Sequence, residues 1–324
     1  ETARMWRSLG HHDATGGFRI DGVTGPDEYS AIADNNVYTN LMAQQNLRAA
    51  ADASEAHPGH AGRLDVDAEE MASWRDAASA MLIPFDDALG VHMQAEEFTE
   101  HARWDFEATP PEKYPLMLYY PYFDLYRKQV VKQADLVLAM HLRGDAFTLE
   151  QKARNVAYYE PRTVRDSSLS ACPQAVLAAE VGHLDLAFDY FAEAAFTDLH
   201  DLHHNARNGL HIASLAGAWI VAVAGFGGMR DHDQSLHFAP RLPAALTRLT
   251  FRMTYRNSRF AVEIGHHGTT YRLLEGPELA VTHHGQDITI VADPVRQPIP
   301  PAPKYPTPTQ PPRRAPRRRG ALNP

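Results

Sequence analysis

Cysteine and long apolar runs are the features that this sequence of 324 residues has least of. Its single cysteine, Cys172, excludes an internal disulfide framework and is typical of a protein in a reducing compartment. The longest stretch of small and apolar residues, Ala216 to Phe226, is too short and too rich in glycine to span a bilayer. No apolar signal segment opens the chain. We therefore expect a cytoplasmic protein without membrane contact.

The charge is unevenly distributed along the chain. The net charge is −9, yet residues 294–324 contain no acidic residue and seven basic ones: Arg296, Lys304, Arg313, Arg314, Arg317, Arg318 and Arg319. The acidic remainder disfavours nucleic-acid binding, and basic tails are most often simply solvated. The same tail holds 11 of the 23 prolines, which predicts a disordered or polyproline-like segment from about residue 294.

Residues 1–234 are dominated by apolar side chains at helical spacing. Thr148 followed by Gln151 predicts the capping box of another helix. Small residues after Gly209 predict a helix that a neighbouring backbone can approach closely. The helical sets include Val37, Tyr38, Leu41 and Met42; Met71, Trp74, Ala78 and Met81; Val130, Ala134, Val137 and His141; Leu184, Ala187, Phe188 and Phe191.

Residues 235–293 predict a small β-domain. Apolar and polar residues alternate from Leu249 to Tyr255, as in a strand with one buried face, and a turn at residues 256–258 leads into a second strand. A second alternating pair flanks the turn at residues 284–287. The predicted fold is mainly α, with a small C-terminal β-sandwich or sheet module and a disordered tail.

The turn from Asp21 to Tyr29 is the first candidate for chemistry. Two glycines and a proline within five residues make a rigid turn that displays Asp27, Glu28 and a tyrosine ahead of a helix. Asp27 could simply cap backbone amides. Alternatively, a carboxyl group held in an apolar pocket keeps its proton near neutral pH and acts as a general acid.

Three further segments carry polar groups that could bind a ligand. The loop around Ser167 and Ser168 precedes a helix and could bind an anion, or could be a serine-rich N-cap. His211 stands at the start of the helix after Gly209, where a structural role is equally open. Residues 132–135 (Lys-Gln-Ala-Asp) suit either a solvated helical face or a sugar ligand beside aromatic residues such as Trp104 and Tyr119.

No sequence pattern indicates a metal or an organic cofactor. The 18 histidines include His200 and His204 at i, i+4, but no HExxH arrangement, and one cysteine cannot build a thiolate site. Neither a glycine-rich phosphate loop nor a Gly-x-Ser-x-Gly elbow is present.

Five ordered motifs together resemble glycoside hydrolase family 65, the inverting α-glucoside phosphorylases and related hydrolases. The motifs are GVTGPDEY (22–29), NNVYTNLMAQQNL (35–47), VKQADLVLAM (131–140), YYEPRTVRDSSLSAC (158–172) and GLHIASLAGAW (209–219). In sequence, the motifs most resemble those of the actinobacterial, kojibiose-phosphorylase-like members. The resemblance implies the second half of an (α/α)6 barrel over residues 1–234, a β-module over 235–293, and an N-terminal part of the same enzyme beyond this chain.

The resemblance also implies roles for particular residues. Glu28 is expected to be the general acid, Lys132 and Gln133 to bind sugar, and Ser167, Ser168 and His211 to bind phosphate. The expected reaction is inverting phosphorolysis of a glucose disaccharide such as kojibiose, trehalose, maltose or nigerose to β-glucose 1-phosphate. Inorganic phosphate is then a co-substrate, and no cofactor is needed. A homodimer is also expected.

The sequence leaves two alternative functions open. In an inverting hydrolase, Glu160 would activate a water molecule in place of phosphate, because His200 to Asn208 depart from the stretch that many phosphorylases carry before the Gly-Leu-His motif. In the other alternative the chain is an inactive, truncated part of such an enzyme. Half a helical barrel would then expose apolar helix faces.

Overall fold

The computed structural model describes residues 1–202, 204–232 and 234–316 of the chain. Contacts divide the chain into two compact units: unit 1 comprises residues 1–143 and 162–166, and unit 2 comprises residues 144–161 and 167–324. This division does not coincide with the predicted boundary at residue 234. The last helices of the predicted catalytic region belong to the same unit as the β-module.

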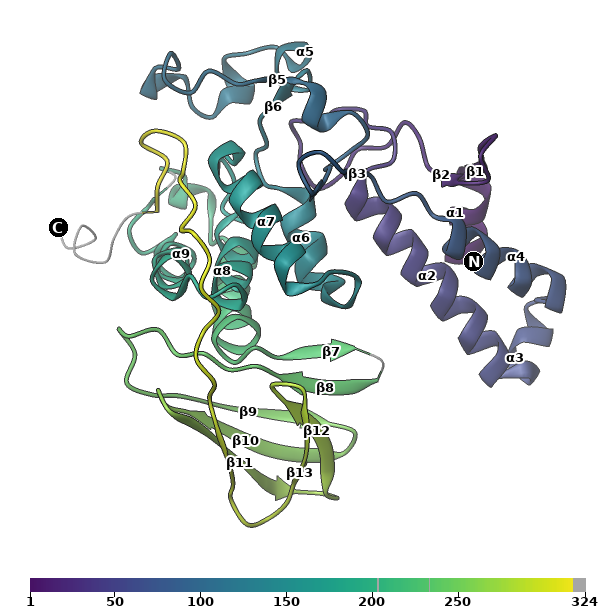
Figure 1. The fold of residues 1–324 in the computed structure, drawn as a ribbon, viewed down its shortest axis with the longest axis vertical. Coiled ribbons are helices and arrows are strands. Elements are labelled where there is room, and N and C mark those ends of the chain that lie inside the picture. The colour runs from purple at the N-terminus through teal and green to yellow at the C-terminus, as the bar shows by residue number, and fades with distance from the viewer. Residues whose placement is uncertain (203, 233, 317–324) are drawn as a thin grey trace. The chain divides into compact units, whose positions relative to one another are not determined.

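Unit 1 is built from helices, short two-stranded pairs and long connecting loops (Figure 1). Its helices are α1 (Thr2–Leu9), α2 (Val37–Ala56), α3 (Pro58–Arg63), α4 (Ala68–Ala80), α5 (Tyr122–Leu125) and α6 (Asp135–Leu142). The strand pairs join β1 (His11–His12) to β2 (Phe18–Arg19), β3 (Phe85–Asp86) to β4 (Val91–His92), and β5 (Ala102–Arg103) to β6 (Lys128–Gln129). The helix predicted from Val130 begins only at Asp135.

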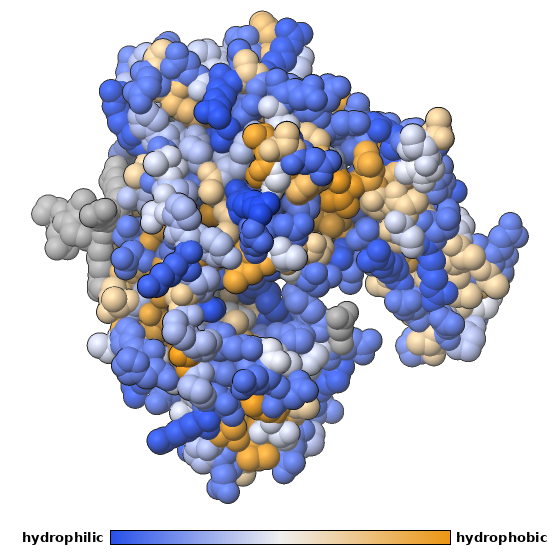
Figure 2. All heavy atoms as spheres, viewed as in Figure 1, coloured by the Kyte–Doolittle hydropathy of each residue, from blue (hydrophilic) through white to orange (hydrophobic). Residues whose placement is uncertain are grey.

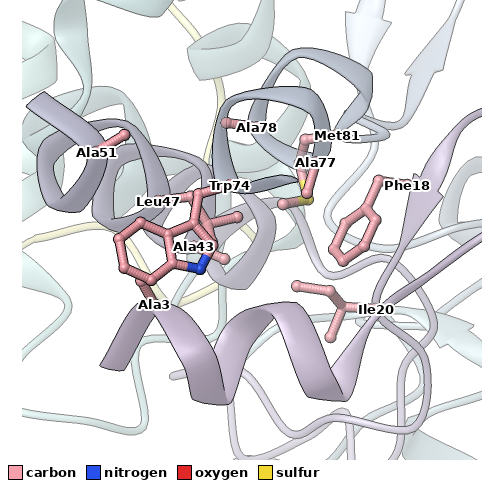
Figure 3. Packing of buried hydrophobic residues seen from close by; sticks show 10 residues of the cluster. All are labelled: Ala3, Phe18, Ile20, Ala43, Leu47, Ala51, Trp74, Ala77, Ala78 and Met81. Atoms are coloured by element: carbon pink, nitrogen blue, oxygen red, sulfur yellow. The ribbon is translucent and has the colours of Figure 1, made fainter. Parts of the chain in front are cut away.

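Side-chain caps explain where the longer helices of unit 1 begin. The Asn36 side chain accepts a hydrogen bond from the Thr39 amide at the start of α2, and Asp67 caps the Glu70 amide at the start of α4. Between these helices and α1 lies a core around the Trp74 indole (Figure 3). Its members are Ala3, Phe18, Ile20, Ala43, Leu47, Ala51, Trp74, Ala77, Ala78 and Met81.

Unit 2 combines a helical bundle with two β-sheets. Its helices are α7 (Leu149–Tyr159), α8 (Ala171–Glu180), α9 (Leu184–Phe196) and α10 (Ile212–Ile220), followed by a π-helical turn at Val221–Phe226. Both hydrogen bonds of the predicted capping box, between Thr148 and Gln151, are present at α7. Helix α10 exposes large apolar side chains, among them Ile212 and Trp219.

The β-module is a sandwich of two four-stranded sheets, ordered β14-β11-β10-β9 and β13-β12-β8-β7 (Figure 1). The strands are β7 (Arg230–His232), β8 (Ser235–Phe238), β9 (Leu249–Tyr255), β10 (Ser258–Ile264), β11 (Gly268–Glu275), β12 (Leu279–His283), β13 (Gln286–Ile290) and β14 (Val295–Pro298). Side chains from both sheets, such as Phe238 and Phe260, share one core. The first strand of the module in chain order is β7.

The two predicted hairpins are confirmed, and their turns have a local cause. Tyr255 pairs with Ser258, and His283 pairs with Gln286, so each loop has two residues. Both loop residues have positive φ in each case: 47° and 66° at residues 256 and 257, and 48° and 79° at residues 284 and 285. Such turns match the right-handed twist of the flanking strands.

The described part of the tail forms a strand and an extended segment, which differs from the disordered form of the prediction. β14 pairs with β11 through residues 295–298, and the chain then runs past α8 and α9 as an extended segment (yellow in Figure 1). Gln310 donates a hydrogen bond to Glu160 over 3.0 Å. Proline prevents helix but not extended backbone, so the extended segment is compatible with the polyproline-like alternative. Arg317, Arg318 and Arg319 lie outside the described residues.

No helix in the described part of the chain is long and apolar enough to cross a membrane. The face of the molecule drawn in Figure 2 is mostly hydrophilic, with scattered apolar patches, as is usual for folded proteins.

Candidate active site

The turn that carries Glu28 is fixed at its base by a short antiparallel bridge. The amides and carbonyls of Val23 and Ala33 exchange hydrogen bonds of 3.0 and 2.8 Å, and the Thr24 hydroxyl donates to the Ala31 carbonyl. Glycine is required at position 25 for a steric reason, because a Cβ atom there would lie 2.1 Å from Asp135 Oδ2. The sequence therefore makes a closed loop with Glu28 at its tip.

The structure brings Glu28, Lys132 and Gln133 together at this loop. Lys132 Nζ forms an ion pair with the Glu28 carboxylate, and Gln133 Nε2 donates to the Pro26 carbonyl over 2.7 Å. Gln133 Oε1 is buried and has no hydrogen-bond partner among the described residues. Glu28 itself is 54% exposed at its side chain, so the apolar pocket expected around it is not present in this structure.

Asp27, beside Glu28, is completely buried and accepts backbone amides, as the capping interpretation predicted. Its Oδ1 accepts from the Lys132 amide at 2.8 Å and from the Tyr29 amide at 3.3 Å. Its Oδ2 accepts from Gln94 Nε2 at 2.8 Å. Burial raises the pKa of Asp27 to about 6, even though these hydrogen bonds favour its charged form.

Asp135 is likewise completely buried, which contradicts the prediction of a solvated helical face for residues 132–135. It is the first residue of α6, whereas Lys132 and Gln133 lie in the loop before that helix. Its Oδ1 accepts the Asp27 amide at 2.6 Å and its Oδ2 accepts Asn36 Nδ2 at 2.7 Å. Burial, and then the charge of Asp27, raises the pKa of Asp135 well above its ordinary value.

Tyr29 anchors the far side of the loop. Its side chain is fully buried, and its hydroxyl donates to Asp166 Oδ2 over 2.6 Å; the Leu116 amide donates to the same oxygen. Burial raises the pKa of Tyr29, so the hydroxyl keeps the proton that it donates. This contact ties the loop to the residue that directly precedes the two candidate phosphate serines in sequence.

The candidate phosphate residues belong to unit 2. Ser167 and Ser168 are half-buried in the loop before α8, where the Ser167 hydroxyl accepts from the Leu169 amide. Ser170 occupies the N-cap position of α8, but its side chain does not cap the helix. This side chain therefore does not compete with an anion for the first amides of α8.

His211 stands at the N-cap position of α10, as predicted. Its Nδ1 lies 2.5 Å from Asp198 Oδ1, and its backbone amide donates to Asp198 Oδ2 over 2.9 Å. The hydrogen bond from His211 holds the pKa of Asp198 below its ordinary value. A carboxylate on Nδ1 fixes the orientation of the imidazole ring.

Glu160 does not have the surroundings of a water-activating base. Its side chain is buried in unit 2, where Oε1 accepts from the Tyr190 hydroxyl and from Gln310 Nε2. Oε2 accepts from Gln174 Nε2 at 2.9 Å. These three neutral donors take three of the about four acceptor sites of the buried carboxylate, so little of it can turn toward a water molecule. The geometry therefore gives the hydrolase alternative no support.

The aromatic side chains considered for sugar contact have different surroundings. Trp104 is half-buried and donates through Nε1 to Thr109 Oγ1, whereas Tyr119 is 50% exposed with the Lys113 ammonium above its ring. Tyr119 is therefore the more accessible of the two rings. Among the residues described by the structure, no group of three or more His, Cys, Asp or Glu side chains could hold a metal ion.

The loop thus displays an acid beside a lysine and a glutamine, in a helical region that a β-sandwich follows in the chain. Residues 1–220 match the model of the glycosyl hydrolase family 65 central catalytic domain, and residues 229–290 match that of the family's C-terminal domain. The chain belongs to glycosyl hydrolase family 65, which confirms the family resemblance.

Known proteins match nearly the whole chain. An uncharacterized glycosyl hydrolase of Mycobacterium tuberculosis is 55% identical over 99% of the chain, and the α,α-trehalose phosphorylase of Geobacillus stearothermophilus is 41% identical over 90%. A solved structure described as a kojibiose phosphorylase from the human microbiome matches with a TM-score of 0.81 and 26% identity over 92% of the chain. This similarity confirms the predicted fold class, a partial helical barrel with a C-terminal sheet module.

The same comparisons fix how much of the relatives the chain represents. It spans 41% of the mycobacterial protein, 39% of the trehalose phosphorylase and 40% of the solved structure.

Proposed function

We propose that this chain belongs to an inverting phosphorylase of an α-linked glucose disaccharide. The proposal depends on one observation: Lys132 and Gln133 contact the loop of Glu28, although about a hundred residues separate these two side chains from Glu28 in sequence. The trehalose, maltose and kojibiose phosphorylases among its relatives support this substrate class.

In the proposed reaction, the Glu28 carboxyl group donates its proton to the glycosidic oxygen as the bond from this oxygen to the anomeric carbon breaks. A phosphate oxygen attacks the anomeric carbon from the opposite face. The products are β-glucose 1-phosphate and glucose, and Glu28 is left as a carboxylate. Phosphate is already anionic, so the reaction needs no carboxylate base to generate the nucleophile.

Lys132 and Gln133 are proposed to bind hydroxyls of the glucosyl unit. The unpartnered Gln133 Oε1 is an acceptor that a sugar hydroxyl could satisfy after a small side-chain movement. Ser167, Ser168 and His211, with the first amides of α8, are proposed to bind phosphate.

The working enzyme is proposed to be larger than this chain. The remaining part that the relatives possess is expected on the N-terminal side, where it would complete the sugar pocket. We expect the enzyme to act in the cytoplasm as a homodimer, with inorganic phosphate as co-substrate and without a cofactor.

The test is to incubate the full-length enzyme, and this chain alone, with trehalose, maltose, kojibiose and nigerose, with and without phosphate. Anomer-resolved NMR follows the products. β-Glucose 1-phosphate formed only with phosphate supports the proposal and identifies the linkage, whereas free β-glucose without phosphate would show a hydrolase. Activity in the full-length enzyme alone would mark this chain as an inactive part.

Glu28→Gln should lower turnover of the disaccharide by about 10²- to 10⁴-fold, because the amide cannot donate the proton. Glu69→Gln, the same change at an exposed position in the first turn of α4, is the matched control. Full activity of the Glu28 variant would refute the assignment. Ser168→Leu should raise the KM for phosphate more than the KM for sugar, and an equal rise in both would argue against the phosphate site.

A further inference from the structure

Two buried carboxylates connect the loop of Glu28 to the loop of Lys132. Asp27 Oδ1 accepts the backbone amide of Lys132, so one carboxylate oxygen joins two segments more than a hundred residues apart in sequence. Gln94 completes the connection: its Nε2 donates to Asp27 Oδ2 and its Oε1 accepts the Asp135 amide at 2.9 Å. Asp135 Oδ1 in turn accepts the Asp27 amide, which closes a ring of hydrogen bonds.

This ring, which we call the carboxylate ring (Asp27, Gln94, Asp135 and the capping Asn36), has no exposed member. Among the described residues, every hydrogen-bond partner of its two carboxylates is a neutral amide. Lys132, the cation that lies nearby in the loop before α6, directs its ammonium to Glu28. Burying carboxylates without a cation is costly, so an arrangement made only for stability would favour neutral residues here.

We propose that Asp27 and Asp135 are positioning residues, which hold Glu28 in place for proton transfer through the loops that the carboxylate ring joins. This inference rests on the proposed function. Neither residue is expected to touch substrate. Their role is to fix the Glu28 turn against the Lys132 loop, since a misplacement of about 1 Å can lower a rate about 10²-fold.

Asp27→Asn tests the ring with a nearly isosteric change. The new amide group would face Gln94 Nε2, which places two donors opposite each other. Gln94 cannot resolve this by flipping, because its Oε1 is needed by the Asp135 amide. Adding Gln94→Glu exchanges the amide and the carboxylate between the two positions. The carboxylate at position 94 can then accept from the side-chain amide at position 27 and from the backbone amide of Asp135. The double variant should therefore restore the ring.

The readout is how the rate depends on the leaving group. α-Glucosyl fluoride has a weakly basic leaving group that needs little protonation, so a misplaced Glu28 should matter less for it. In the full-length enzyme with phosphate, we expect Asp27→Asn to lower kcat on the disaccharide about 10²-fold and on the fluoride only a few-fold. The ratio of the two rates does not depend on the fraction of folded enzyme.

Two further variants keep the outcomes distinct. Glu28→Gln should change the same ratio, and an unchanged ratio there would refute the proposed function itself. Glu70→Gln makes the same kind of chemical change in the Arg4 pair of unit 1, where the carboxylate has a structural partner, and should leave the ratio unchanged.

The proposal is supported if Asp27→Asn shifts the ratio and the double variant restores it to within about threefold. It is overturned if Glu28→Gln shifts the ratio while Asp27→Asn lowers both rates equally. It is also overturned if the double variant leaves the disaccharide rate as low as the single one.

Discussion

One carboxylate cluster in each unit shows partners of opposite character: Glu180 is half-buried, whereas Asp27 and Asp135 are fully buried. In unit 2, Glu180 lies between Lys152 Nζ and Arg230 Nη2, each 2.6 Å from one of its oxygens. In unit 1, the carboxylates of Asp27 and Asp135 have only neutral amides as hydrogen-bond partners among the described residues.

The pKa values follow the partners. Burial raises the pKa of Glu180, but the charges of Arg230 and Lys152 outweigh it, and the result lies below the ordinary value. The pKa of Asp27 is instead raised to about 6, because burial outweighs its hydrogen bonds. Glu180 thus stabilises its unit as an ion, whereas burial disfavours the charged form of the carboxylate ring. This difference is what points to a positioning role for the ring.

The largest effect is expected on breaking the unit 2 cluster. Glu180→Gln leaves the largely buried Lys152 and Arg230 without a counter-charge, which should lower the free energy of unfolding by about 3 kcal/mol. Urea unfolding followed by circular dichroism measures it. Glu150→Gln, in an exposed pair with Arg154, is the control and should change little. Equal effects of the two changes would show that burial does not strengthen the Glu180 cluster.

The pH dependence of stability should separate the two kinds of carboxylate. A raised folded-state pKa gives stability that is present at low pH and lost as pH rises through about 6, and a lowered pKa gives the reverse. Between pH 4 and 7 the destabilisation by Glu180→Gln should therefore grow. Over the same range the destabilisation caused by Asp27→Asn should shrink by about 2 kcal/mol. Urea titrations at several pH values measure both, and parallel trends would contradict the comparison.

Much of this fold could be predicted from local sequence signals. The alternation from Leu249 to Tyr255 and the Thr148–Gln151 capping box indicated structures that the residues themselves enforce. Strand β14 could not be predicted, because two other strands separate it from its partner β11 and proline-rich composition suggests disorder or polyproline structure. The start of α6 was misplaced because apolar spacing continues into the buried loop before it.

The candidate site was predicted only in part, for the same reason. Glu28, Lys132 and Gln133 stand out through their motifs, but Gln94 lies in no recognisable pattern and joins the carboxylate ring only through tertiary contacts. Asn36 could have been found, since an asparagine before an amphipathic helix is a typical N-cap. The burial of Asp135 could not have been predicted, because a carboxylate in a polar run usually faces water.

A steric change should disturb the carboxylate ring without altering its charge. Gly25→Ala would place a Cβ atom 2.1 Å from Asp135 Oδ2 and 2.5 Å from Asn36 Nδ2, so the ring must shift. We expect the free energy of unfolding to fall by about 2 kcal/mol. Gly22→Ala, in the same loop, is the comparison: nothing lies within 4 Å of its added Cβ, although its φ of 68° adds backbone strain. Urea unfolding measures both variants, and a smaller loss at Gly25 than at Gly22 would contradict a tightly packed ring.

The smallest effect is expected at Glu160, a third buried carboxylate, whose partners are neutral like those of Asp27 but belong partly to the tail. Gln310→Ala removes one of its three donors and leaves Tyr190 and Gln174 in place. The free energy of unfolding, measured in urea, should fall by about 1 kcal/mol, against no change for Gln286→Ala at an exposed strand position. If the tail did not bind Glu160, both variants would unfold alike, and only the donors within the helical bundle would keep this carboxylate buried.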